Sequence, residues 1–180
     1  MIPIERLTGR LGNKMFQYAY LYSQARKGEI PDIYVQDEEY FSEFREEIRA
    51  IFSQDIPDQT DMVAIHVRRG DYVNNPFYVN LMDTDYYDKA MQIFPDEKFL
   101  VFSDDIEWCK KQELFDGCAF AKGDEISDLN LMASCKGIIM ANSSYSWWAG
   151  YLSNGVVVAP LEWFADGVER TVCPESWIRI

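Results

Sequence analysis

Apolar and polar residues in the first third of the chain recur with the period of a helix. Apolar side chains return every three or four positions in residues 13–27 and again in residues 38–52, where Glu and Arg cover the opposite face. This spacing predicts two amphipathic helices, each burying one face against a core. Gly12 lies directly before the first helix, where it allows a turn.

From residue 62 onward the pattern changes to short continuous apolar runs with helical segments between them. Continuous runs predict strands buried on both faces, and helices between successive strands imply parallel crossovers. We therefore predict an α/β fold with a parallel, Rossmann-like sheet and helices on both faces. The expected strands are residues 62–67, 98–103, 118–121, 137–141 and 155–159. The expected helices are residues 84–94, 105–114, 125–134 and 144–152.

A change in character near residues 55–58 divides the chain. Helical patterns with little clear strand precede it, and alternating strands and helices follow. The length of 180 residues permits one domain or two very small ones. We predict a reduced N-terminal unit at residues 1–55 and a larger sheet unit at residues 56–180.

Composition excludes several classes of protein. Hydrophobic residues make up 48% and aromatic residues 15%, which excludes a disordered chain. No apolar run approaches the roughly 20 residues of a membrane span, and residues 1–5 lack the basic and apolar regions of a signal peptide. One histidine and four cysteines without CxxC spacing argue against structural zinc. We expect free thiols in a cytoplasmic protein.

The net charge of −13 argues against a nucleic-acid-binding protein, which would carry a basic surface. It is compatible with one small anionic ligand held by a few local arginines. Ligands of parallel sheets bind beyond the carboxyl ends of the strands, so the polar residues there are the candidate site. These residues are His66, Arg68, Asp71, Asp104, Asp105, Ser143 and Ser144.

The chemistry of these side chains indicates an anion site. Arg68 offers a planar fork suited to phosphate, and a helix beginning at Ser143 or Ser144 presents free N–H groups. Each feature also has an ordinary explanation: the arginine could close a turn through a salt bridge, and the serines could be helix caps alone. Their combination at three strand ends favours a diphosphate clamp, with Asp104 or Asp105 accepting hydrogen bonds from a base or sugar.

Several segments, taken in order, resemble the signature blocks of the α-1,2-fucosyltransferases, glycosyltransferase family 11. The segment at residues 66–72 resembles the HxRRxD-type motif shared with α-1,6- and protein O-fucosyltransferases. The turn at residues 9–13, with Arg10, Gly12 and Asn13, opens the N-terminal block. The matching segments are residues 9–19, 66–72, 102–105, 128–135 and 142–149.

The resemblance implies a two-lobed, GT-B-type fold whose C-terminal lobe holds the donor GDP-fucose. It implies transfer of fucose, with inversion and without a metal ion or other cofactor, to a hydroxyl group of a glycan acceptor, usually on galactose. Arg68 would hold the β-phosphate, and Asp71 is the candidate general base. The other implied binding residues are His66, Asp104 or Asp105 near the guanine and ribose, Ser143 and Ser144 at the phosphates, and Arg10, Gly12 and Asn13 across the cleft.

The chain departs from the family in size, because only 48 positions separate Tyr18 from His66. Most of the N-terminal, acceptor-side lobe is therefore expected to be reduced. Two alternatives remain open: a non-catalytic module that binds a GDP-sugar or a glycan, and an unrelated α/β protein with structural arginines. A homo-oligomer could rebuild a cleft wall through Trp163, Phe164 and Trp177.

Overall fold

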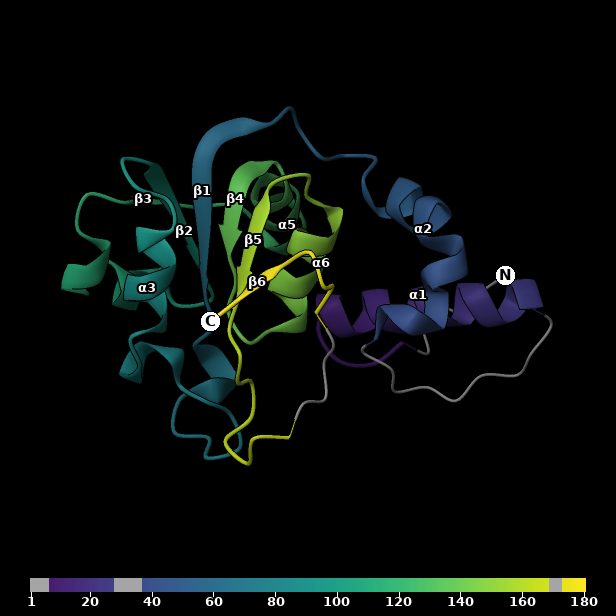
Figure 1. Ribbon diagram of the computed structural model, residues 1–180, viewed down its shortest axis with the longest axis horizontal. Coiled ribbons are helices and arrows are strands. Elements are labelled where there is room, and N and C mark those ends of the chain that lie inside the picture. Colours follow the sequence, from purple (N-terminus) through teal and green to yellow (C-terminus); the bar gives the residue numbers. More distant parts are fainter. Residues whose placement is uncertain (1–6, 28–36, 169–172) are drawn as a thin grey trace.

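Six parallel strands form a single sheet in the order β3-β2-β1-β4-β5-β6 (Figure 1). The computed structural model describes residues 7–27, 37–168 and 173–180, so the first residues, where we expect no signal peptide, lie outside it. The strand order reverses between β1 and β4, as in doubly wound folds. The predicted parallel, Rossmann-like sheet is confirmed. The strands are β1 (Thr60–Val67), β2 (Lys98–Ser103), β3 (Ala119–Phe120), β4 (Cys135–Ile139), β5 (Val156–Ala159) and β6 (Ile178–Arg179).

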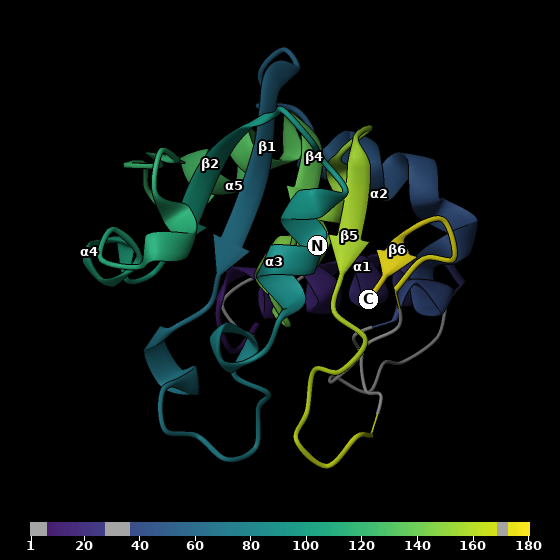
Figure 2. The same ribbon diagram turned by 60° about the vertical axis from the view of Figure 1, so that its left-hand side comes forward.

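Helices cover both faces of the sheet (Figures 1 and 2). Alternation along β1 shows the two layers: Val63 and Ile65 belong to a cluster with Tyr87, while Ala64 belongs to a cluster with Trp148. Both faces are therefore dry, as the apolar strand runs predicted. The α-helices are α1 (Leu11–Lys27), α2 (Arg45–Phe52), α3 (Tyr86–Gln92), α4 (Ile106–Cys109), α5 (Glu125–Ala133) and α6 (Ser144–Leu152).

Several predicted helix boundaries were wrong. The expected helix at residues 38–52 is split into a 3-10 segment, η2 (Glu38–Phe44), followed by α2. The helix expected to reach residue 114 ends at Cys109, and a separate 3-10 turn, η5 (Glu113–Phe115), follows. An apolar period cannot distinguish a continuous helix from two short ones that bury the same side. Strand β6 was missed because two residues are too few to show a pattern.

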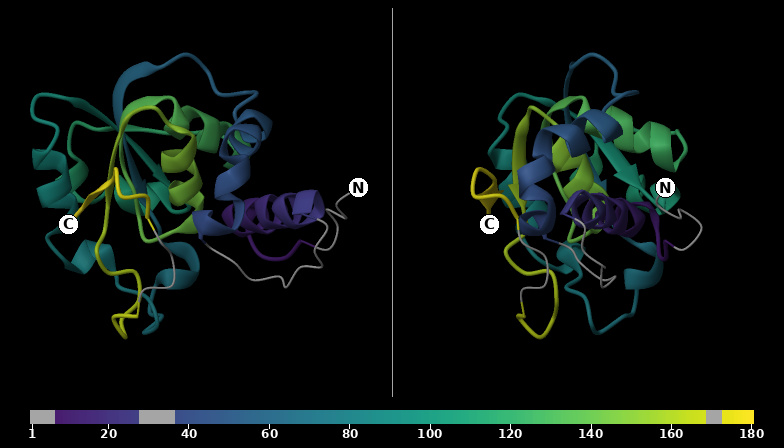
Figure 3. Two further views of the ribbon diagram at one scale, coloured as in Figure 1. Left: turned by 45° about the vertical axis from the view of Figure 1, so that its right-hand side comes forward. Right: turned by 90° about the vertical axis from the view of Figure 1, so that its right-hand side faces the viewer.

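The N-terminal helices pack onto α6 (Figure 3). Phe16 is fully buried, with its ring centroid 4.5 Å from that of Trp147 and 5.0 Å from that of Trp148. Phe41 of η2 stacks on Trp148 at 5.7 Å. The helices before residue 55 thus share a hydrophobic cluster with the sheet. The division at residues 55–56 stays a prediction.

The aromatic residues considered for an interface between subunits pack within this chain. Trp163 and Phe164 are buried, and the ring of Trp177 lies 5.6 Å from that of Trp147. They contribute to the core of the single chain, and self-association stays a prediction.

The structure also bears on thiols, membranes and metals. All four cysteines are free thiols. Across residues 7–27, 37–168 and 173–180, each helix is too short or too polar to cross a membrane. The same ranges contain no group of three or more His, Cys, Asp or Glu side chains arranged to hold a metal ion.

Replacing Phe16 with alanine tests how strongly α1 is docked. Because the ring is fully buried between α1 and α6, Phe16→Ala is expected to lower the free energy of unfolding by about 3–5 kcal/mol. Urea denaturation followed by circular dichroism measures it. The control Ile126→Ala, at a side chain 61% exposed on α5, should change stability by less than about 0.5 kcal/mol. Equal losses in the two variants would contradict tight docking.

Candidate functional site

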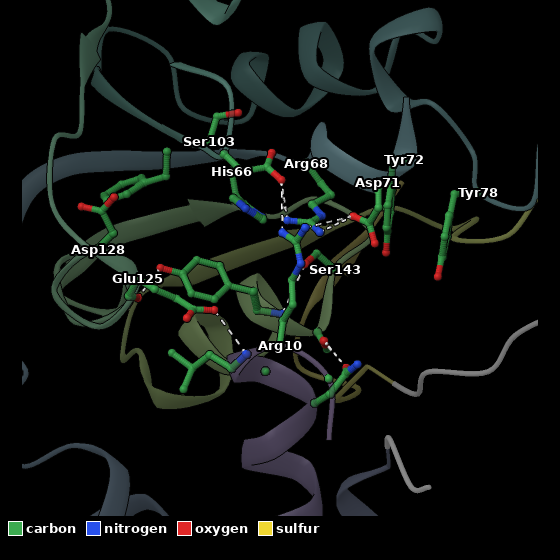
Figure 4. A pocket seen from close by; sticks show the side chains of 18 of the residues that line it. Arg10, His66, Arg68, Asp71, Tyr72, Tyr78, Ser103, Glu125, Asp128 and Ser143 are labelled. Carbon is green, nitrogen blue, oxygen red and sulfur yellow. Dashed lines mark hydrogen bonds and ion pairs between the residues drawn. The ribbon is translucent and has the colours of Figure 1, made fainter. Parts of the chain in front are cut away.

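A cleft of about 820 Å³ opens at the carboxyl edge of the sheet (Figure 4). Its walls come from the start of α1, from the loops after β1, β2, β4 and β5, and from the start of α5. It therefore lies beside the point where the strand order reverses, as expected for a ligand site in such a sheet. Nine of the predicted site residues line it: Arg10, Gly12, Asn13, His66, Arg68, Asp71, Asp104, Ser143 and Ser144.

Two arginines and two aspartates form a charge quartet in the middle of the cleft. Arg68 donates hydrogen bonds to Asp104 Oδ2 at 2.6 Å and to Asp71 Oδ1. Arg10 Nη1 lies 3.4 Å from Asp104 Oδ2, and its Nη2 lies 3.7 Å from Asp71 Oδ1. Arg68 is only 11% exposed, whereas Arg10 and Asp71 are each 58% exposed. Asp71 is thus the more accessible carboxylate partner of Arg68.

Asp104 is held more firmly than Asp71. Its second oxygen, Oδ1, accepts a hydrogen bond from the backbone N–H of Arg69 at 2.9 Å. A side chain on Gly70 would place its Cβ 2.4 Å from Asp104 Oδ2, so a glycine is required beside this carboxylate. Asp104 therefore ties the end of β2 to the end of β1.

The neighbouring residues Arg69 and Asp105 do not line the cleft, and their contacts stabilise the fold. The Arg69 guanidinium lies 3.6 Å from the ring centroid of Trp108, and its Nε is 3.9 Å from Asp105 Oδ2. Asp105 accepts a hydrogen bond from the backbone N–H of Trp108 at 3.2 Å and caps α4. Of the two aspartates predicted to contact ligand, only Asp104 lines the cleft. Neighbouring residues in extended chain point in opposite directions, and sequence alone did not show which one faces inward.

His66, the penultimate residue of β1, is buried at the floor of the cleft. Its ring centroid lies 5.3 Å from that of Tyr145. Burial, followed by the nearby charge of Arg68, lowers the pKa of His66 to about 3. The imidazole is therefore neutral at physiological pH, and its Nδ1 has no hydrogen-bond partner among the described residues. A neutral imidazole can both donate and accept a hydrogen bond.

The starts of α1 and α6 meet at the cleft. A Cβ on Gly12 would lie 2.5 Å from the carbonyl carbon of Ser144, so only glycine permits this approach. The Ser144 hydroxyl donates to Asn13 Oδ1 at 2.7 Å, and Ser143 caps α6 by accepting the N–H of Tyr145 at 3.3 Å. Helix starts carry positive partial charge and attract anions.

Three acidic residues that line the cleft, Asp124, Glu125 and Asp128, were not among the predicted site residues. Asp128 of α5 accepts a hydrogen bond from the backbone N–H of Gly123 at 3.0 Å, and burial raises the pKa of its carboxyl group. Asp128 is the first residue of the sequence block at residues 128–135, and this position was the available signal. The block was assigned only to the helix α5, so the contribution of Asp128 to the cleft was not predicted.

Four aromatic residues at the other end of the cleft were also missed. Tyr72 and Tyr78 stack face to face, with centroids 3.7 Å apart and planes within 4°. Phe77 and Phe164 line the cleft beside them. The available signal was the clustering of aromatic residues in the loop after β1. A loop has no periodic pattern, so the sequence did not show which way these rings face.

Comparison with known proteins finds one matching family and several proteins with similar sequences. The family described as Glycosyl transferase family 11 matches residues 42–180. The chain is 37% identical to an alpha-1,2-colitosyltransferase of Escherichia coli, over 91% of this chain and 67% of that protein. It is 32% identical to the O-antigen biosynthesis glycosyltransferase WbnK of Escherichia coli, over 72% of this chain and 48% of the relative. It is also 32% identical to galactoside 2-alpha-L-fucosyltransferase Sec1 of Mus musculus, over 53% of this chain and 30% of the relative.

The chain thus spans about two thirds of the first of these relatives, and half or less of the other two. The alignment with the colitosyltransferase extends over 194 positions, more than the 180 residues of the chain. That relative therefore has residues within the aligned region that this chain lacks.

The low pKa of His66 predicts how stability responds to pH. The unfolded chain binds a proton on this imidazole near its ordinary pKa of about 6.5, whereas the folded protein resists protonation down to about 3. Above pH 6.5 the imidazole is neutral in both states, and the folded protein keeps its full stability. As pH falls from 6.5 toward 3, the unfolded chain binds the extra proton, so the free energy of unfolding falls. Between pH 6.5 and 5 the free energy of unfolding should fall by about 2 kcal/mol. Urea titrations at the two pH values measure it.

The variant His66→Gln should lack this loss of stability between pH 6.5 and 5. The difference between the variant and the wild type separates the contribution of the imidazole from that of the many carboxylates. Because His66 is the single histidine, its ring resonances can also be followed directly by NMR. Titration of the ring near pH 6.5 in the folded protein would contradict the buried, neutral state.

Proposed function

Because the chain belongs to glycosyl transferase family 11, we propose that it transfers fucose from GDP-fucose to the 2-hydroxyl group of a galactoside, with inversion at the fucose C1. The family membership agrees with the resemblance of the sequence blocks to α-1,2-fucosyltransferases. The observation that supports the proposal best is the meeting, in one cleft, of Arg68 and Arg10 with the serine-capped start of α6.

The proposed donor places its diphosphate between these groups. The β-phosphate lies against Arg68, whose planar guanidinium can bind two phosphate oxygens at once. The N–H groups at the start of α6 and the Ser144 hydroxyl complete the pocket. When the bond from the fucose C1 to the phosphate oxygen breaks, GDP leaves with the electron pair. Arg68 stabilises the charge that develops there, so the proposed step requires no metal ion.

Phosphate binding also changes the pairing of Asp71. A diphosphate competes with the carboxylates for Arg68, and Asp71 is the more exposed one and lacks the backbone N–H bond that holds Asp104. In the proposal Asp71 is released toward the cleft and serves as the general base. It accepts the proton of the acceptor hydroxyl while that oxygen bonds to the fucose C1.

The guanine base is proposed to lie at the Asp128 end of the cleft. Figure 4 shows Asp128 and Tyr72 on opposite sides of Arg68. Guanine carries two N–H donors on one edge, and a carboxylate can accept both. Uracil and adenine lack that pair of donors. His66 lies between Asp128 and Arg68 in the same view and offers a neutral donor or acceptor.

A second donor is favoured by one of the comparisons. The relative that aligns with 91% of this chain is named for transfer of colitose, which is fucose without its 3-hydroxyl group. GDP-colitose is therefore the alternative donor, and both sugar nucleotides belong in the assays. A non-catalytic GDP-sugar or glycan-binding module differs from either enzyme by binding its ligand without turnover.

The adjacent arginines give a matched test of nucleotide binding. GDP at 100 times its dissociation constant should stabilise the protein by about 2.7 kcal/mol, measured as a rise in melting temperature. Arg68→Ala should weaken GDP binding by about 2–5 kcal/mol, because the phosphate loses its charged partner. Arg69→Ala is the control, since its guanidinium packs on Trp108 outside the cleft; it should lower the melting temperature yet keep the response to GDP.

UDP and ADP serve as competing nucleotides in the same experiment. A stronger response to UDP or ADP than to GDP would contradict the proposed donor. A response to GDP that both arginine variants lose equally would contradict the place assigned to Arg68.

Removing the proposed base tests the reaction itself. Asp71→Asn should lower kcat for GDP release from GDP-fucose, with a galactoside present, by about 10²–10⁴-fold. GDP should still raise the melting temperature of this variant. If the wild-type protein binds GDP but turns over neither GDP-fucose nor GDP-colitose with a panel of galactosides, the non-catalytic module is favoured.

A further inference from the structure

Two loops that are far apart in the sequence lie side by side beyond the carboxyl edge of the sheet (Figures 1 and 2). One follows β1 and contains residues 72–80, and the other follows β5 and contains residues 160–168. The backbone N–H of Val79 donates to Trp163 O at 3.2 Å, and that of Ala165 donates to Phe77 O at 3.0 Å. The Asn142 side chain donates to the carbonyl groups of Val79 and Trp163, both at 2.9 Å. The two loops therefore form one braced unit.

This unit presents an aromatic wall, made of Tyr72, Phe77, Tyr78 and Phe164, to the cleft. Beyond the stacked tyrosines, the ring centroid of Phe164 lies 5.1 Å from that of Phe77 and 5.7 Å from that of Tyr78. The Tyr72 hydroxyl donates to the carbonyl oxygen of Asn142 at 3.0 Å, which fixes one end of the stack. The wall is preorganised by these contacts.

Packing of the core does not account for the whole wall. Tyr72 and Phe77 belong to neither of the hydrophobic clusters that fill the two faces of the sheet. Phe77 remains 45% exposed, although it lies in a cleft with a buried aromatic neighbour. An exposed ring of this kind, beside polar groups that converge on one cavity, is typical of a small-molecule site.

The wall borders the charge quartet. Asp71 directly precedes Tyr72, and the Arg68 guanidinium carbon lies 5.4 Å from the Tyr72 ring centroid. Asp128, proposed to bind the base, lies on the opposite side of Arg68 (Figure 4). A donor that spans the cleft from Asp128 to Arg68 would therefore bring its reacting carbon close to the wall.

From this geometry we infer that the aromatic wall is the acceptor subsite and binds a galactopyranoside by stacking, an inference that rests on the proposed function. The hydrogens on C3, C4 and C5 of galactopyranose give the sugar one apolar face, which can lie on aromatic rings and bury apolar surface. The hydroxyl edge then points toward Asp71. The acceptor oxygen bonds to the fucose C1 as the bond to phosphate breaks, GDP takes the electron pair, and Asp71 takes the proton.

This assignment gives the acceptor a wall made from the sheet unit itself. The loops after β1 and β5 would then supply contacts that a larger N-terminal lobe was expected to supply. Phe77 is the specificity-determining residue of the wall, because its exposed ring has the most surface to offer a sugar.

Substitution of Phe77 tests the subsite, with methyl β-D-galactopyranoside as acceptor and GDP-fucose as donor. Phe77→Ala should raise the KM for the galactoside at least tenfold and leave the KM for GDP-fucose within twofold of wild type. Phe77→Leu keeps apolar volume without a ring and should show the same separation. Tyr40→Ala removes an aromatic side chain of similar exposure, 44%, outside the cleft, and should change neither KM.

An unchanged KM for the galactoside in both Phe77 variants would overturn the inference, as would an equal rise in the two KM values. Saturation-transfer NMR of the galactoside, recorded with GDP present, tests the subsite without turnover. Wild-type protein and Tyr40→Ala should transfer saturation to the sugar, and Phe77→Ala should lose most of it. Absence of transfer in the wild type would also overturn the subsite. By contrast, saturation transfer without turnover of GDP-fucose would contradict only the proposed function.

Discussion

The cleft depends on the neutralisation of two arginines by two aspartates. Asp104 is the centre of this arrangement, since it contacts Arg68 and Arg10 and accepts the backbone N–H of Arg69. It thereby joins the start of α1 to the ends of β1 and β2. Without this carboxylate, Asp71 alone would have to neutralise both guanidinium groups, at a cost in free energy. The requirement for glycine at position 70 follows from the same contact.

The small N-terminal unit contributes to this centre because aromatic packing holds it in place. Phe16 lies between α1 and the tryptophans of α6, while Gly12 lets the two helix starts come together. Arg10 and Asn13 flank Gly12 at the start of α1, so both contacts help to hold them at the cleft. Docking of α1 therefore also completes one wall of the cleft, even though the unit is short.

The sequence predicted the sheet and the place of the cleft, because buried parallel strands leave continuous apolar runs and because ligands bind at the carboxyl ends of such strands. It did not separate Asp104 from Asp105, since their opposite directions depend on where β2 ends and α4 begins. The break between η2 and α2 was hidden by an apolar stripe that continues through it. The aromatic wall could not be predicted for another reason. Tyr78 and Phe164 are far apart in the sequence and come into contact only when β1 and β5 lie in one sheet.

The charge quartet has a consequence for the ionic-strength dependence of ligand binding. Because Arg68 and Arg10 already have carboxylate partners, an incoming phosphate exchanges one ion pair for another instead of creating a new one. Affinity at such a site varies less with salt than at an open cluster of arginines, whose attraction is screened directly. By the same argument, a ligand with several negative charges would compete with the two carboxylates better than a simple anion. In the proposed function, these carboxylates would therefore make the cleft selective for ligands with several negative charges.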